Sequence, residues 1–154
     1  MLKALVPVDG SANSLGAIRH VIKLVQAREP LEIHLLNVQA PLKSDVTTFI
    51  SGSVVKAYHE EKAREALAPA ARLLDEAGLS YASHIVVGHI PETIAAWALS
   101  LQCDKVIMGT RGLGTVTQLL LGSITHAVIH YMDPGIPVTL VKARVGPDTM
   151  EARP

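Results

Sequence analysis

The chain of 154 residues is 49% hydrophobic and 18% charged, so it is long enough to bury one sizeable core. Its 14 basic and 14 acidic side chains cancel, which argues against nucleic acid or an anionic membrane as a partner. Its one cysteine, Cys103, excludes an internal disulfide framework, and there is neither a signal-peptide pattern nor the roughly 20 apolar residues of a membrane span. We expect a cytoplasmic protein.

The first elements alternate between strand and helix. An apolar run over residues 2–8 predicts a buried strand. Apolar side chains then recur at helical spacing behind a candidate N-cap at Ser11 or Asn13, and Pro30 ends this helix. A second apolar run, over residues 32–38, predicts the second strand.

A mobile loop is expected next, over residues 41–53, which are rich in Pro, Ser, Thr and Gly. A long charged helix follows to about Glu76, with Gly78 as its C-terminal cap. Pro69 lies inside this helix and is expected to kink or divide it, because proline has no N–H to donate.

Strands and helices continue to alternate up to the last strand. They are expected at residues 83–87 (strand), 91–101 (helix), 105–108 (strand), 123–132 (helix) and 138–141 (strand). Five strands alternating with four helices imply an α/β fold, a single-domain open parallel sheet with helices on both faces. We expect this domain over residues 1–144 and a flexible tail over residues 145–154.

A glycine-rich segment, GTRGLGTVTQLLLGS over residues 109–123, connects the fourth strand to the last helix. Gly109, Gly112 and Gly122 would permit left-handed backbone angles and a close approach of the main chain to a ligand. Ser123 follows the last glycine and opens the helix, where free N–H groups and the helix dipole favour an anion. The segment therefore predicts a phosphate site.

Two familiar phosphate loops do not fit this segment. A Walker loop needs Gly-Lys-Ser/Thr, whereas Gly114 is followed by Thr115, so the lysine of a Walker loop is missing. Gly114 is interpreted as a loop glycine. The dinucleotide fingerprint GxGxxG starts at Gly112 but meets Thr117 where its third glycine is required.

The spacing that does occur is two residues between Gly109 and Gly112, and nine between Gly112 and Gly122-Ser123. It resembles the nucleotide-binding signature of the universal stress protein family, in its ATP-binding branch. The segments KALVPVDGSANS, IHLLNV, IPETI, VIMGTRG and GIPVTLVK are similar to family landmarks, in family order. The resemblance implies an adenine nucleotide hydrolase-like sheet with strand order 3-2-1-4-5.

The resemblance also implies an adenine nucleotide, ATP or AMP, beyond the carboxyl ends of the first and fourth strands, where the strand order reverses. Asp9 would accept hydrogen bonds from the ribose, although it could also be only a turn residue that starts the first helix. The main chain of Val38 would meet the adenine edge, and Pro7 would supply an apolar wall. The phosphate end of the site would comprise Gly109, Gly112, Gly122, Ser123 and Ile124. Mg²⁺ would accompany ATP through its phosphates.

Other candidate residues have ordinary structural interpretations. Arg111 is as well suited to solvent as to a phosphate and is left out of the core site. His126 and His130 have the spacing of a metal pair but lack a third ligand, so they are interpreted as exposed helix residues and no metal site is expected. Trp97 is expected to pack a helix on the sheet, and Cys103 to be a small, semi-buried residue rather than a reactive thiol.

No residue pattern near the glycines indicates rapid hydrolysis, which needs a positioned water, a metal-organising carboxylate or a mobile arginine. We expect a nucleotide-dependent regulator in the stress response, with at most slow ATP hydrolysis and no catalytic residue. Residues 137–141 form an aliphatic edge strand that invites a homodimer, as in relatives, unless Pro137 and Lys142 protect it.

Two other functions stay open. One is a dimerising adaptor without nucleotide. The other is an enzyme of the adenine nucleotide hydrolase superfamily, although the first turn reads DGSANS rather than the SGGxDS pyrophosphate loop of those enzymes.

Overall fold

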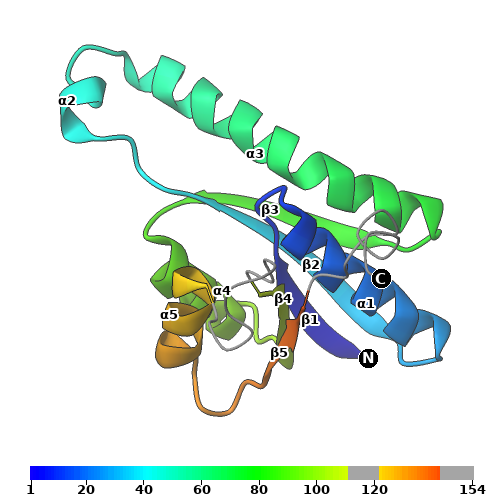
Figure 1. Ribbon diagram of the computed structural model, residues 1–154. Helices are drawn as coiled ribbons and strands as arrows, with labels where there is room; N and C mark the ends of the chain where they lie inside the picture. Colours follow the sequence, from blue (N-terminus) through cyan, green and yellow to red (C-terminus); the bar gives the residue numbers. More distant parts are fainter. Residues whose placement is uncertain (111–121, 143–154) are drawn as a thin grey trace, which may run out of the picture.

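A computed structural model describes residues 1–110 and 122–142, and Figure 1 shows a sheet with helices on both faces. Ten elements follow one another along the described chain. They are β1 (Leu2–Pro7), α1 (Ala12–Gln26), β2 (Leu31–Gln39), α2 (Ser44–Thr47), α3 (Gly52–Glu76), β3 (Tyr81–Val87), α4 (Ile90–Ser100), β4 (Lys105–Gly109), α5 (Ser123–Tyr131) and β5 (Val138–Val141). None of these described helices is both long and apolar enough to cross a membrane.

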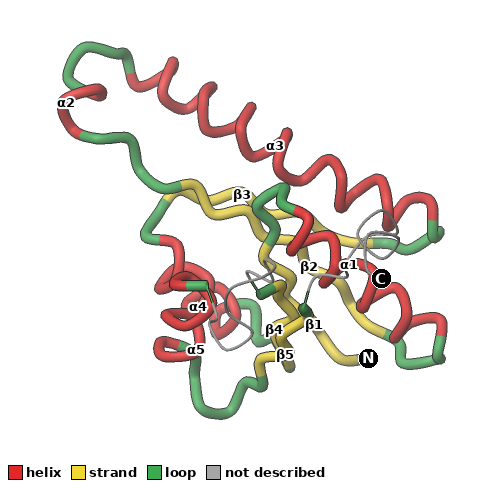
Figure 2. The backbone as a smooth tube through the Cα atoms, in the orientation of Figure 1, coloured by secondary structure: helices red, strands yellow, loops and turns green. Residues whose placement is uncertain are grey.

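The five strands lie in the order β3-β2-β1-β4-β5, and each neighbouring pair is parallel. This confirms the predicted α/β fold and its strand order. After β1 the chain adds β2 and β3 on one side of β1, and then adds β4 and β5 on its other side. β1 and β4 therefore lie side by side at the point where the strand order reverses (Figure 2). Ligands of open α/β sheets bind beyond the strand ends at such a point.

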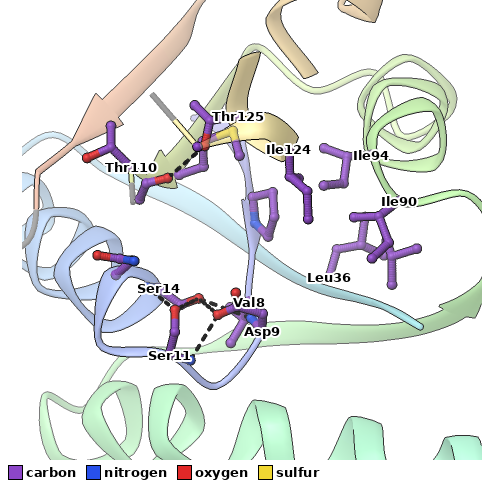
Figure 3. A pocket seen from close by; sticks show the side chains of 16 residues that line it. Val8, Asp9, Ser11, Ser14, Leu36, Ile90, Ile94, Thr110, Ile124 and Thr125 are labelled. Carbon is purple, nitrogen blue, oxygen red and sulfur yellow. Dashed lines mark hydrogen bonds between the residues drawn. The ribbon is translucent and has the colours of Figure 1, made fainter. Parts of the chain in front are cut away.

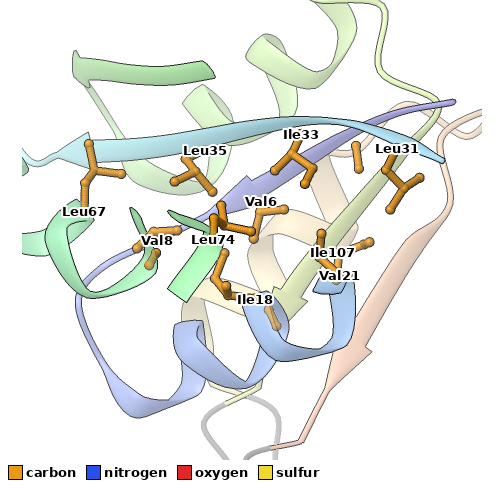
Figure 4. Packing of buried hydrophobic residues seen from close by; sticks show 13 residues of the cluster. Val6, Val8, Ile18, Val21, Leu31, Ile33, Leu35, Leu67, Leu74 and Ile107 are labelled. Atoms are coloured by element: carbon orange, nitrogen blue, oxygen red, sulfur yellow. The ribbon is translucent and has the colours of Figure 1, made fainter. Parts of the chain in front are cut away.

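The sheet separates two hydrophobic cores, because successive side chains of a strand point to opposite faces. The core beneath α1 and α3 contains Ala4, Val6, Ile33, Leu35 and Ile107 from the strands (Figure 4). The core beneath α4 and α5 contains Leu5, Leu36, Val106 and Met108. Burial on both faces explains why the central strands are nearly continuous apolar runs, and each fully buried Leu contributes about 1.5–3 kcal/mol.

Helix α1 begins at a capped turn that also shapes the site described below. Ser11 is the N-cap residue, and its Oγ accepts a hydrogen bond from the Ser14 N–H at 3.4 Å. The structure thus selects Ser11 over Asn13 as the cap. Gly10 has a φ of 86° and its α-carbon faces the backbone of Ala66, so a side chain there would be strained and would crowd α3.

Of the two outcomes expected at Pro69, a kink or a division of the long helix, the division is wrong, because α3 runs uninterrupted for 25 residues. The missing N–H of Pro69 would have paired with the carbonyl of Glu65, an exposed residue whose carbonyl water can satisfy. Burial of Leu67 and Ala70 against the sheet holds the helix on both sides of the proline.

Two further boundaries differ from the prediction. The expected loop over residues 41–53 contains the short helix α2, in which the hydroxyls of Thr47 and Thr48 donate to the Ser44 carbonyl at 3.0 and 2.7 Å. Strand β3 begins at Tyr81 rather than Ser83, because its pairing with β2 extends to that residue. The predicted tail over residues 145–154 lies outside the described residues.

Candidate functional site

A pocket of about 160 Å³ opens where β1, β2 and β4 end, bounded by the first turns of α1, α4 and α5 (Figure 3). Six of the residues predicted to bind a ligand line this pocket: Pro7, Asp9, Val38, Gly109, Gly122 and Ile124. Ser123 lines an adjoining groove instead, together with Ile124. Gly112, like Arg111 and Gly114, lies outside the described residues.

The carboxylate of Asp9 is anchored through one of its two oxygens. Oδ1 accepts hydrogen bonds from the Ser11 N–H at 2.9 Å and from the Ser14 hydroxyl at 2.6 Å (Figure 3). Partial burial raises the pKa of Asp9, but these hydrogen bonds outweigh burial and leave its pKa below the usual value. No described residue bonds Oδ2, so Asp9 holds the helix turn and keeps an acceptor for a ligand.

The main chain of Val38 faces the same pocket. Its neighbour Gln39 accepts the Gly88 N–H at 2.9 Å on the β3 side, and Leu36 accepts the Val8 N–H at 2.8 Å on the β1 side. Because these groups alternate along a strand, the N–H and C=O of Val38 also point to the β1 side, beyond the end of β1 at Pro7. Within the described chain neither group has a backbone partner, so a donor and an acceptor are presented together.

Asn37 explains why Val38 does not simply continue the ladder to β1. Its side chain is 2% exposed, and Nδ2 donates to the Val8 carbonyl at 2.7 Å, where the Val38 N–H would otherwise bond. The Asn37 Oδ1 in turn accepts Gln39 Nε2 at 2.6 Å. A satisfied buried amide therefore ends the β1–β2 ladder at the pocket.

Gly109 ends β4 against the first turn of α1. A Cβ at this position would overlap the carbonyl carbon and oxygen of Asn13, so only glycine lets strand and helix approach this closely. The Gly109 carbonyl accepts the Thr125 hydroxyl at 3.3 Å, and the next amide, Thr110 N–H, donates to the Val141 carbonyl at 3.0 Å. The glycine therefore serves packing between β4 and α1 as well as the pocket wall.

Gly109 and Gly122 do not use the left-handed backbone angles that glycine permits. Among the described glycines only Gly10 and Gly78 have a positive φ, while Gly122 has a φ of −57° and a ψ of 151°. Any residue can adopt those angles, because the chain enters α5 through an extended N-cap and needs no reversal there. What is particular to Gly122 is its place, buried in the pocket wall.

Helix α5 presents its N-terminus at the pocket. Its first intrahelical bond runs from His126 N–H to the Gly122 carbonyl at 2.9 Å. The N–H groups of Ser123, Ile124 and Thr125 therefore have no partner in the described chain, and the first turn carries no acidic side chain. Such a helix end attracts negative charge.

Sequence reasoning missed the apolar wall opposite these polar groups. Ile90 and Ile94 of α4 line the pocket on that side (Figure 3), and Met108 of β4 is a further apolar lining residue. Apolar residues of a pocket wall have the same spacing in the sequence as core residues, so the sequence pattern does not distinguish the two. The IPETI segment, which contains both isoleucines, was the available signal, as DGSANS was for Ser14.

The remaining candidates lie elsewhere. Trp97 packs against the core beneath α4, and Cys103 is buried, which raises the pKa of its thiol, so both predictions of ordinary packing are confirmed. His126 and His130 are exposed on α5. Across residues 1–110 and 122–142 no three metal-ligating side chains are grouped.

Comparison with known proteins agrees with this geometry. A universal stress protein of Methanocaldococcus jannaschii is 29% identical over 156 residues, which cover 92% of this chain and 95% of the relative. Its solved structure superposes with a TM-score of 0.75, covering 94% of this chain and 98% of the other.

Two further structures share the fold. One is a family member of Arabidopsis thaliana with AMP bound, 19% identical, with a TM-score of 0.67 and 94% of each chain covered. The other is a universal stress protein in complex with cAMP, 22% identical, with a TM-score of 0.62, covering 93% of this chain and 98% of the other. The model of the universal stress protein family matches residues 1–142. This chain therefore belongs to the universal stress protein family.

Proposed function

We propose that this protein binds an adenine nucleotide in the pocket between α1, α4 and α5 and acts as a nucleotide-dependent regulator in the stress response. The observation that carries the proposal is the convergence of three unused sets of polar groups on one pocket: the main chain of Val38, Oδ2 of Asp9 and the first-turn amides of α5. Relatives of the same fold that bind AMP and cAMP support it.

Each set of groups suits one part of the ligand. Val38 offers a donor beside an acceptor, which matches the edge of adenine, and Ile90, Ile94 and Met108 supply apolar walls for the base. Asp9 would accept the ribose hydroxyls, since an ionised carboxylate only accepts. The N-terminus of α5 would hold the phosphates, which would meet the Ser123 hydroxyl if they extend into the adjoining groove.

We infer that ATP is the ligand that occupies the whole site, whereas AMP would fill the base and ribose parts and place a single phosphate at its α5 end. Mg²⁺ would be held mainly by the phosphates and water, which is its usual mode with nucleotides and needs few protein ligands. The groups named here position and neutralise charge but supply no general base, so the proposal includes at most slow hydrolysis.

The proposed regulator is a cytoplasmic homodimer that pairs through β5. This strand bonds β4 on one side only, and its residues are half-buried in the isolated chain. The Val141 carbonyl accepts a hydrogen bond from the Thr110 N–H, on the β4 side of the strand. Because backbone groups of successive strand residues point to opposite sides, the N–H of Leu140 points to the open edge. Leu140→Pro removes that donor and should give a monomer in sedimentation; an unchanged dimer would show that another surface pairs.

Nucleotide binding is tested by identifying, with mass spectrometry, any nucleotide released from the purified protein, and by calorimetry with ATP and AMP. Gly122→Val should abolish binding while the protein stays folded, because the backbone angles suit valine but the side chain would enter the pocket. Gly52→Val, at a helix start with open space around it, is the matched control. No released nucleotide together with no measurable affinity would favour the dimerising adaptor instead.

A further inference from the structure

Two histidines from neighbouring strands are directly hydrogen-bonded beneath α4. Nδ1 of His34, on β2, lies 2.8 Å from Nε2 of His84, on β3. Nε2 of His34 lies 2.8 Å from Oε1 of Glu32. His34 is 8% exposed, and the ring of Trp97 from α4 lies 5.1 Å from that of His84. The pair thus lies between two strands and a helix, with His34 buried and His84 half-buried.

The donors and acceptors of Glu32, His34 and His84 determine which ring nitrogens carry protons. Ionised Glu32 can only accept, so His34 must donate to it from Nε2. A neutral His34 then has only an acceptor at Nδ1, and His84 must donate from Nε2. Each bond of the neutral chain therefore has one donor and one acceptor.

The hydrogen bond between the two histidine rings tolerates one added proton but not two. With one proton, one ring becomes an imidazolium and donates to its neutral partner, so the bond between the rings persists. With two protons, both facing nitrogens carry hydrogen and positive charge at a separation of 2.8 Å, so the bond cannot form. The two protons therefore belong to the pair and not to either ring.

The charges around the pair act on the two steps differently. Glu32, exposed at the rim, has its pKa lowered by the hydrogen bond from His34 and by the positive charges of Lys3, 4.0 Å away, His34 and the N-terminus. It therefore stays ionised, and its negative charge lies beside the pair. Burial and the charge of His34 lower the pKa of His84, which opposes the second proton.

The other elements packed around the pair bring mostly neutral groups. The contact from α4 is Trp97, and β4 begins beside Cys103, a buried thiol, and Asp104. Asp104 is held by the Lys3 N–H at 2.7 Å, so its carboxylate is directed to β1. Glu32 is therefore the carboxylate that bonds the pair.

We propose that Glu32, His34 and His84 form a proton-operated latch that holds β2, β3 and α4 together, remains closed with one added proton and opens with the second. Opening would free the His84 ring from His34 and loosen Trp97 and α4. Two residues that line the pocket lie next to the latch. Leu36 is the register partner of His84, and Ile94 lies one turn before Trp97 on α4. Any effect on a ligand rests on the proposed function above.

Trp97 is the only tryptophan of the chain and reports on the latch directly. Its fluorescence should be followed from about pH 8 to about pH 4.5, across the range in which histidines titrate. We expect quenching as the pair takes its first proton, then a red shift as α4 loosens, both reversed on return to neutral pH. A response without two steps would overturn the latch.

Variants separate the latch from general acid unfolding. His84→Gln should remove the second step, because only one ring is left to take a proton, and Glu32→Gln should move the first step to lower pH. His126→Gln, at an exposed position of α5, should leave both steps unchanged. Wild-type behaviour of His84→Gln would overturn the latch.

A measurement on the unmodified protein covers the case in which a variant fails to fold. Histidine ¹⁵N spectra should show Nε2–H tautomers for both rings at neutral pH and two coupled titrations. Independent titrations would overturn the latch. Calorimetry with ATP over the same range tests the pocket separately, since absence of binding at every pH contradicts the proposed function but leaves the fluorescence result standing.

Discussion

Gly109 at the end of β4 lies so close to Asn13 in the first turn of α1 that the two backbones leave no room for a side chain between them. The contact joins a strand from the second half of the chain to the helix that carries Ser11 and Ser14. The position of the Asp9 turn relative to α5 therefore depends on a glycine.

Gly109→Ala should lower the free energy of unfolding by about 1–3 kcal/mol, because the added methyl overlaps the Asn13 backbone and α1 must shift. Urea denaturation measures this loss. Gly52→Ala, where nothing lies within 4 Å, should cause none. Equal stability of the two variants would mean that β4 and α1 are not in close contact.

The strand order was predicted from the family resemblance alone, whereas the Asp9 turn follows from a local pattern, the DGSANS segment after the first apolar run. The packing of Gly109 against Asn13 was not predicted, because Asn13 is its neighbour only after folding. The His34–His84 bond was missed for the same reason, since the β2–β3 register joins residues 50 positions apart. The apolar wall at Ile90 and Ile94 was missed because pocket and core residues share one pattern.

Asp9→Asn should weaken ATP binding by roughly 10- to 100-fold, because a charge-assisted hydrogen bond contributes about 1.5–3 kcal/mol. Calorimetry at neutral pH, where the lowered pKa keeps Asp9 ionised, measures the change. Ser51→Ala removes the N-cap of α3 and controls for lost helix capping, so it should cost about 1 kcal/mol of stability without changing affinity. Wild-type affinity for Asp9→Asn would exclude Asp9 from the binding site.

His59→Leu should raise the free energy of unfolding by about 1–2 kcal/mol. The side chain of His59 is 5% exposed on α3, and neither ring nitrogen has a partner in the described structure, so two polar atoms are buried at a cost. Thermal and urea unfolding provide the measurement, and His126→Leu, at an exposed site, should stay within about 0.5 kcal/mol. A destabilised His59→Leu would indicate that the ring makes a favourable polar contact.

Acid should destabilise the protein partly through His84. Its pKa is lowered from 6.5 on folding, so the unfolded chain binds a proton more readily than the folded one. The contribution of neutral His84 is therefore complete above about pH 6.5 and declines as the pH falls toward the folded value. His84→Gln should flatten this part of the curve of melting temperature against pH, whereas His126→Gln should reproduce the wild-type slope.

The end of the β1–β2 ladder at Asn37 has a consequence for mutational scanning. If the base is read by the amide and carbonyl of residue 38, exchanging that side chain for most others leaves the recognition atoms in place, and an alanine scan would record a neutral position. Proline alone among the natural substitutions deletes the amide. Base selectivity in this protein would then depend on where the β1–β2 ladder ends, because that position leaves a backbone amide and carbonyl free. Most side-chain substitutions at residue 38 would not change it.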